Sequence, residues 1–212
     1  MALSAAVFLP LVAALLCWAK PLRSIAWVIT VFCLSLSFAS AVISSDQVLQ
    51  GGRTVAIPDW IEADGLSALV LLLVTFVCTL AAIFAGGYMR HETRSKDRLW
   101  WFYCNYNLFA FSLAIVPVLN RVNLVWVAVE LVTLFATLLV AFESTPGTLE
   151  AAWKMAILTI MGAPIALFGF LTLYWAFRSS GGGTAETWQN LYAMAPNMSP
   201  NLLRLSFLLV FV

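Results

Sequence analysis

Long apolar runs separated by short polar stretches dominate the chain. A helix needs about 20 mostly apolar residues to cross the hydrocarbon core of a bilayer, and its backbone groups must be paired internally. The runs predict six full transmembrane helices, at residues 2–18, 24–44, 65–88, 99–119, 122–142 and 151–177. A seventh span begins at about Pro200, so residues 200–212 are expected to be only its start. The predicted fold is therefore an all-α, multi-pass membrane protein in which residues 1–212 form one membrane domain.

The polar stretches between the spans predict the orientation of the chain. Lys and Arg gather in the loops that face the cytoplasm. The first loop carries Lys20 and Arg23, and the third carries four basic residues between positions 90 and 98. The second loop, residues 45–64, has four acidic residues against Arg53 alone. The first and third loops are therefore predicted to be cytoplasmic, which places the N-terminus on the extracytoplasmic side.

Residues typical of a membrane interface lie near the ends of the predicted spans. Tryptophans anchor helices at this depth because their rings are amphipathic. Those near the predicted cytoplasmic ends are Trp18, Trp27, Trp100, Trp101 and Trp153. Asn105 and Asn107, at the start of the fourth span, are likewise interpreted as interfacial.

Two loops are expected to have structure of their own. Within residues 45–64, Gly51-Gly52 marks a turn between two short β-prone stretches, which predicts a small extracytoplasmic hairpin. Asp64, directly before the third span, is expected to cap it. Residues 184–194, "TAETWQNLYAM", predict a short amphipathic helix that lies on the membrane interface.

Composition supports a membrane protein and narrows its chemistry. The chain is 63% hydrophobic and 10% charged, with a mean hydropathy of +0.96, whereas soluble domains are about 45–50% apolar and about 25% charged. A net charge of +1 offers no basic surface for nucleic acid. The single histidine, His91, lies in a charged loop, and no cysteines form a Cys-x-x-Cys pair, so no metal and no cofactor are expected. The cysteines interpreted as buried apolar thiols are Cys17, Cys33, Cys78 and Cys104.

One acidic residue interrupts the fifth span. Glu130 lies near the middle of "NLVWVAVELVTLFATLLVAFES" and is the only charged residue between Arg121 and Glu143. A charge at the centre of a membrane helix costs about 2.5–3.5 kcal/mol on insertion scales. Protonation, a cationic partner or a water-filled cavity relieves this cost, and each makes the carboxylate a candidate for proton translocation. The alternative is a structural role, in which Glu130 is hydrogen-bonded across helices.

Polar residues continue the face that carries Glu130. Residues seven apart lie close to one helix face, and Asn123, Glu130 and Thr137 keep this spacing, with Thr133 one turn from Glu130. The sequence therefore predicts a supporting polar stripe of Asn123, Thr133 and Thr137. Threonines within membrane helices also bond back to their own helix, so the alternative of a purely local role stays open.

The sixth span contains a second candidate charge, Lys154. Its side chain can lie a turn inside the bilayer or extend to the cytoplasmic surface, and Glu150, four residues earlier, can pair with it. Both interpretations stay open. Pro164, after Gly162, is predicted to kink this helix because it leaves the carbonyl of Ile160 without its donor.

Three segments together resemble one family. They are "DGLSALVLLLVTFV", "NLVWVAVELVTLFATLLVAF" and "LEAAWKMAILTIMGAPIALFGFLTLY". In this order and at these separations they resemble the antiporter-like membrane subunits of respiratory complex I and, more closely, those of the membrane-bound nickel–iron hydrogenases. The "EAAWK" opening of the sixth span favours the hydrogenase-type branch. The resemblance covers nearly the whole chain but only the N-terminal half of a family member.

The resemblance implies roles for the two charges and implies partners. In that family the fifth-span glutamate is an ion-pair partner in proton translocation, which falls on Glu130, and the sixth-span lysine falls on Lys154. Family members have two inverted repeats and a broken seventh helix with a buried lysine, which this chain does not reach. The resemblance therefore implies a subunit in the bacterial cytoplasmic membrane that assembles with other membrane subunits. One of these is expected to supply the missing downstream helices.

Three functions remain compatible with these residues. The first is a proton-translocating or energy-coupling subunit of a complex I-like or hydrogenase-like oxidoreductase. The second is the membrane partner of an inorganic carbon uptake complex driven by the proton-motive force, or of a multi-subunit cation/proton antiporter. The third is an accessory scaffold without transport. In each case the chain is expected to have no redox or hydrolytic site of its own.

Overall fold

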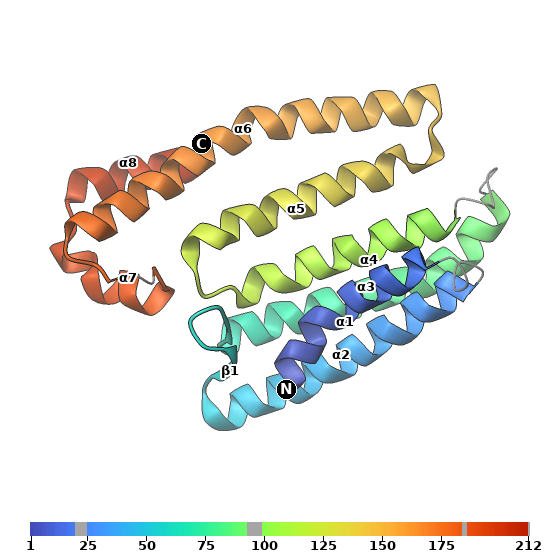
Figure 1. Cartoon of the computed structure of the whole chain (residues 1–212), viewed down its shortest axis with the longest axis horizontal. Coiled ribbons are helices and arrows are strands. Elements are labelled where there is room, and N and C mark those ends of the chain that lie inside the picture. Colours follow the sequence, from blue (N-terminus) through green and yellow to red (C-terminus); the bar gives the residue numbers. More distant parts are fainter. Residues whose placement is uncertain (20–24, 93–98, 184–185, 212) are drawn as a thin grey trace.

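The chain forms a bundle of helices with nearly parallel axes (Figure 1). The computed structural model describes residues 1–19, 25–92, 99–183 and 186–211. Its α-helices are α1 (Ala2–Trp18), α2 (Ala26–Gly51), α3 (Gly65–Glu92), α4 (Leu99–Ile115), α5 (Val122–Val140), α6 (Pro146–Ser179), α7 (Trp188–Met194) and α8 (Pro200–Phe211). The short 3-10 helices are Val116–Val118, Ala141–Glu143 and Ala195–Asn197, and the strands are β1 (Thr54–Ile57) and β2 (Ile61–Ala63).

The predicted fold class, an all-α membrane protein, is confirmed by the length and hydropathy of these helices. Helices α2 to α6 are each long and apolar enough to cross a bilayer. The 17 residues of α1 coincide with the first predicted span but rise only about 26 Å, slightly less than the hydrocarbon core. Helix α8 contains 12 residues of the predicted seventh span.

Three helices extend beyond the predicted spans, with α3 reaching Glu92 instead of residue 88. Helix α2 continues to Gly51, so residues 45–51, which the sequence assigned to the second loop, are helical. Helix α6 begins at Pro146 rather than at residue 151. The Thr145 hydroxyl accepts a hydrogen bond of 3.2 Å from the Thr148 amide and so caps this start. Apolar content alone located these spans, and it misses polar first or last turns that remain helical.

A hairpin occupies the second half of the second loop. Strands β1 and β2 pair antiparallel, and their turn contains Asp59 at a φ of 62°. The predicted turn at Gly51-Gly52 is therefore wrong, because Gly52, at a φ of 77°, ends α2 instead. A glycine that permits positive φ serves a helix end and a hairpin turn equally well, so the sequence does not distinguish them.

Asp64 caps α3 as predicted. Its Oδ1 accepts a hydrogen bond of 2.8 Å from the amide of Ser67. This bond lowers the pKa of the Asp64 carboxyl below its ordinary value, because it stabilises the charged form. The predicted amphipathic helix at residues 184–194 is present over Trp188–Met194, and Thr184 and Ala185 lie outside the described residues.

The core lies among α1 to α4, where hydrogen bonds join neighbouring helices. The Ser37 hydroxyl donates to the Ala6 carbonyl at 2.5 Å, and the Tyr106 hydroxyl donates to the Cys78 carbonyl at 2.6 Å. Asn107 is fully buried in this core and donates to the Thr30 hydroxyl of α2, while its depth in the membrane stays a prediction. The cysteines predicted to be buried thiols are buried and free, namely Cys17, Cys33, Cys78 and Cys104.

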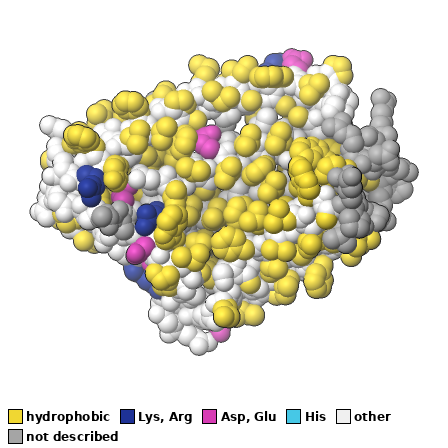
Figure 2. Space-filling model, viewed as in Figure 1, with side chains coloured by type: hydrophobic (Ala, Val, Ile, Leu, Met, Phe, Trp, Pro, Cys, Tyr) yellow, Lys and Arg dark blue, Asp and Glu magenta, His cyan; other side chains and the backbone are white. Residues whose placement is uncertain are grey.

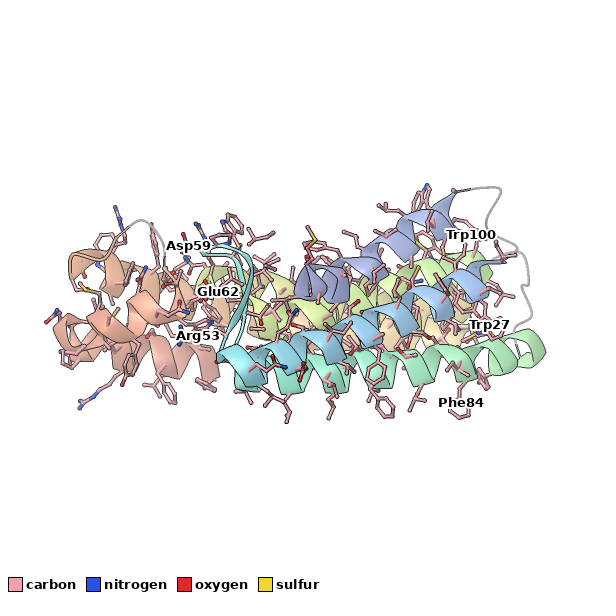
Figure 3. All side chains as sticks on the ribbon, turned by 90° about the horizontal axis from the view of Figure 1, so that it is seen from below. Trp27, Arg53, Asp59, Glu62, Phe84 and Trp100 are labelled. Carbon is pink, nitrogen blue, oxygen red and sulfur yellow. The ribbon has the colours of Figure 1, made fainter. Side chains whose placement is uncertain are left out.

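The two ends of the bundle differ in chemistry. Figure 3 shows Arg53, Asp59 and Glu62 at the hairpin, where the four-helix core ends and the C-terminal helices extend further, and Trp27 and Trp100 at the opposite end of that core. Ring centroids of Trp18, Trp100 and Trp101 lie 5.8–6.1 Å apart at the tryptophan end. The cytoplasmic location predicted for this end depends on basic residues that lie outside the described residues, namely Lys20, Arg23, Arg94, Lys96 and Arg98. The side chain of Arg90 is also outside them. The orientation of the chain stays a prediction.

Helices α5 and α6 are far less covered than the four-helix core. In each of them 6% of the residues in the span are buried, against 50% in α4. Helix α8 packs along the C-terminal half of α6, close to Gly169, and the N-terminal half of α6 is covered mainly by α5 (Figure 1). Apolar faces of α5 and α6 are therefore available to lipid or to other helices.

Candidate functional site

Glu130 lies near the middle of α5 and is half-buried. Among the residues that the structure describes, its carboxylate has neither an ion-pair partner nor a hydrogen bond. Figure 2 shows that the face toward the viewer is largely hydrophobic, with few acidic or basic side chains. A carboxylate at this depth without a counter-ion is costly, so it requires a proton, water or a cation supplied by a neighbour.

The predicted polar stripe is present but is bonded largely within its own helix. The Thr133 hydroxyl donates to the Glu130 carbonyl at 2.9 Å, and the Thr137 hydroxyl donates to the Thr133 carbonyl at 2.9 Å. This is the local arrangement that the sequence left open. Each hydroxyl oxygen can still accept a further hydrogen bond, so the threonines can hold water beside Glu130.

Lys154 lies on the exposed surface near the start of α6 and pairs with Glu150. The ammonium Nζ is 2.5 Å from a Glu150 carboxylate oxygen, and both side chains are about two-thirds exposed. This is the surface pair that the sequence offered as one alternative. An exposed pair of this kind contributes only about 0.3–0.5 kcal/mol to stability.

The hydrogen bond between Trp126 and Ala163 shows how Glu130 and Lys154 are aligned. The Trp126 indole on α5 donates to the Ala163 carbonyl on α6 at 3.0 Å. The two helices are antiparallel and joined by a short turn (Figure 1), so Glu130 lies approximately level with Thr159. Lys154 is then about five residues, or about 7 Å, nearer the turn. The structure does not bring the two predicted charges into contact.

Pro164 does not interrupt α6. The helix runs from Pro146 to Ser179, and the Trp126 bond attaches α5 to the carbonyl directly before the proline. Gly162, two residues before Pro164, has open space where a side chain would lie. The predicted kink at Gly162 and Pro164 stays a prediction.

Three segments distant in the sequence meet at the hairpin end of α5. The amide of Asn120 donates to the Trp60 carbonyl at 2.9 Å. The amide of Val122 donates to the Glu186 carbonyl at 3.2 Å, and the amide of Trp188 donates to the Asn120 carbonyl at 3.2 Å. The start of α5 is thus held between the hairpin and the segment that follows α6.

These segments, together with α6, line a polar pocket of about 220 Å³. Its lining residues are Trp60, Arg121, Asn123, Leu124, Tyr174 and Glu186. The Arg121 guanidinium lies over the Trp60 ring, 4.3 Å from its centroid, which is a cation–π contact. Both carboxylate oxygens of Glu186, Oδ1 of Asn123 and Nε of Arg121 are buried, and none has a hydrogen-bond partner within the described part of the chain.

Glu186 was not found by sequence reasoning. It is only 4% exposed, and burial raises the pKa of its carboxyl to about 7. In the sequence it is one acidic residue in a polar loop, where an acidic residue is ordinary. No local signal separates it from exposed residues such as Asp59, because its burial depends on pairing with a segment more than sixty positions away.

Comparison with known proteins gives a family match and relatives. Residues 54–97 match the family described as NADH-ubiquinone oxidoreductase (complex I), chain 5 N-terminus. The chain is 30% identical over 155 residues to a hydrogenase-4 component F homologue of Methylacidiphilum infernorum, covering 70% of this chain and 33% of that protein. It is 32% identical over 179 residues to the NAD(P)H-quinone oxidoreductase chain 5 of Synechocystis sp., covering 77% and 25% respectively.

A solved structure shares the fold. A chain in the membrane-bound sulfane sulfur reductase, an archaeal respiratory membrane complex, superposes with a TM-score of 0.80 at 18% identity. The superposition covers 98% of this chain and 43% of that chain. This chain therefore spans a third or less of the two curated relatives and less than half of the solved chain.

Proposed function

Because this chain is homologous to the antiporter-like membrane subunits of complex I and of related hydrogenases, we propose that it translocates protons within such a respiratory complex. The relatives are named as a component or chain of larger oxidoreductases, which supports a place for this chain in a multi-subunit membrane assembly. The residues that perform the transfer are inferred from this chain alone.

The unpaired carboxylate of Glu130 carries the proposal. It lies at the middle of an apolar helix, on the face that also bears Asn123 and Thr137. A structural glutamate at this depth would be expected to hold a hydrogen bond to a neighbouring helix, yet its carboxylate makes none within the described residues. The side chain is thus available to accept and release a proton.

Lys154 is proposed as the cation that modulates Glu130. Its side chain is long, and an axial offset of about 7 Å is small enough for a flexible lysine to approach the carboxylate after leaving Glu150. The approach of the ammonium favours the ionised form of Glu130 and releases its proton, and its withdrawal favours uptake. Changes elsewhere in the complex would drive this exchange.

Other membrane subunits are the proposed partners. The exposed apolar faces of α5 and α6 are suited to further helices, and this chain covers only 33% of the hydrogenase-4 component F homologue. We propose that a partner subunit supplies further helices here. We place the assembly in the bacterial cytoplasmic membrane, with the hairpin of β1 and β2 on the extracytoplasmic side. This orientation agrees with the acidic residues of that loop and the tryptophans at the opposite end.

Replacing Glu130 by glutamine tests the function. The amide keeps the shape of the side chain but cannot carry a proton. In inverted membrane vesicles that contain the native complex, E130Q should retain electron transfer and lose the quenching of a ΔpH-sensitive dye. Repeating the assay with and without sodium would show whether sodium replaces the proton.

Glu143 provides the matched control. It lies in the turn after α5 and is exposed, so E143Q removes a carboxylate at the same helix pair without touching the stripe. E143Q should translocate protons at the wild-type rate. Wild-type translocation in E130Q, with the complex assembled, would refute the proposed function and favour a scaffold.

A further inference from the structure

The pocket at the outer end of α5 has the properties of a proton-exchange site rather than of an ion-binding site. A calcium site needs about six or more oxygen ligands. The unpaired oxygens that the described residues of this pocket supply are the carboxylate oxygens of Glu186 and the amide oxygen of Asn123, and the positively charged Arg121 lines the same pocket. The pocket is therefore poorly suited to calcium. An anion, in turn, would meet the Glu186 carboxylate. A pocket of about 220 Å³ with several unpaired polar atoms is suited to water.

The pocket borders the polar face of α5 at Asn123. Asn123 lines the pocket and lies seven residues before Glu130, on the same face of the helix. Seven residues rise about 10 Å, a distance that a short chain of water molecules spans. The pocket is therefore placed between the outer surface and Glu130.

We propose that Glu186 is the group through which this subunit exchanges protons with the extracytoplasmic solution. The proposal rests on the proposed function, since it assigns the outer end of the path that serves Glu130. Three observations carry it. Glu186 is 96% buried, and neither of its carboxylate oxygens has a hydrogen-bond partner among the described residues. Glu186 also lines the same pocket as Asn123.

The chemistry is a single proton transfer in each direction. A proton that arrives from Glu130 through water converts the Glu186 carboxylate into the neutral acid. The acid then transfers the proton to water at the outer surface and becomes a carboxylate again. A pKa of about 7 allows both forms to be populated near neutral pH.

Burial raises the pKa of the Glu186 carboxyl, and polar or charged side chains of several elements lie around the site. Arg121 of the α4–α5 connection and Tyr174 of α6 line the same pocket. Arg178, in the last turn of α6, donates to the carbonyl of Gly183 at 3.1 Å. On the hairpin, Glu62 accepts a hydrogen bond of 3.0 Å from Gln189. Arg121 is thus the positive charge that lines the pocket together with Glu186, and its guanidinium is held over the Trp60 ring.

E186Q, with D59N as its control, tests the assignment in the native complex. Asp59 is an exposed carboxylate on the same hairpin end, and asparagine tolerates its left-handed backbone, so D59N removes a neighbouring carboxylate without strain. Proton translocation in inverted vesicles should fall several-fold in E186Q and stay unchanged in D59N. Infrared spectra recorded during a pH titration of the complex should contain a protonated-carboxyl band near neutral pH that E186Q lacks.

The outcomes separate this inference from the proposed function. Wild-type translocation in E186Q together with loss in E130Q would overturn the role of Glu186 and leave the function intact. A carboxyl band identical in the wild type and E186Q would overturn it as well, because Glu186 would then not titrate in this range. Loss of translocation in D59N to the same degree as in E186Q would show that any carboxylate at this end suffices, and would also overturn it.

Discussion

Asn107 on α4 donates a hydrogen bond of 2.7 Å from its side-chain amide to the hydroxyl of Thr30 on α2. Both residues have no exposed surface, and the same Asn107 nitrogen also donates to the Tyr103 carbonyl at 2.7 Å. The Cys17 thiol of α1 lies 3.8 Å from the Thr30 hydroxyl. A small polar cluster thus joins three helices inside the core, where lipid offers no alternative partners.

Double-mutant analysis should detect the coupling between these two residues. Combining T30V with N107L should reveal an interaction free energy of about 0.6–1.7 kcal/mol, the range found across membrane helices. The measurement is the free energy of unfolding from denaturant titration in mixed micelles. T172V is the control, because Thr172 donates only to the Phe168 carbonyl of its own helix and should be nearly neutral. Additive effects of T30V and N107L would contradict a direct bond.

Two adjacent glycines of α3 should respond differently to alanine. A Cβ at Gly86 would lie 2.1 Å from the Trp27 indole nitrogen, which donates to the Ala82 carbonyl at 3.0 Å. G86A should therefore displace the ring and destabilise the protein by about 1–3 kcal/mol. G87A meets no atom within 4 Å and should be neutral or stabilising. Thermal unfolding in detergent measures both, and equal shifts would contradict the close packing of α2 on α3.

Substitutions of Lys154 and Glu150 should distinguish an effect on stability from an effect on proton translocation. Since the pair is exposed, K154M and E150Q should each change the free energy of unfolding by no more than about 0.5 kcal/mol. K154M should nevertheless lower proton translocation in vesicles, because Glu130 loses its cation, whereas E150Q should retain it. Unchanged translocation in K154M would restrict Lys154 to the surface pair seen here.

Protonation of Glu186 should make stability depend on pH. Its folded-state pKa of about 7 lies above the ordinary 4.5, so between these values the folded protein binds the proton more tightly than the unfolded chain. The contribution is fully present below about pH 4.5, decreases as the pH rises towards 7, and is absent above about pH 7. E186Q should unfold with a weaker pH dependence than the wild type in this window. D59N should keep the wild-type slope, and an unchanged slope in E186Q would contradict a buried, titrating Glu186.

Sequence reasoning singled out Glu130 as a candidate and did not single out Glu186, for one physical reason. A charge within twenty apolar residues is costly wherever the helix packs, so Glu130 is anomalous in the sequence itself. Glu186 lies in a polar loop and becomes unusual only when residues 186–188 pair with residues 120–122 and bury it. The sequence likewise did not decide the environment of Lys154. A position inside the bilayer and a surface pair with Glu150 were both compatible with the residues around it.

The sequence by itself determined the helical membrane fold and located α1 to α6 and α8, because hydrocarbon enforces long apolar helices independently of their neighbours. It also determined the cap of α3 at Asp64, which is a local interaction. Tertiary structure alone decided that Gly52 ends a helix while Asp59 makes the turn, that Asn107 binds Thr30, and that Glu186 is buried. These features depend on contacts between segments far apart in the chain, whose energies no local pattern of residues encodes.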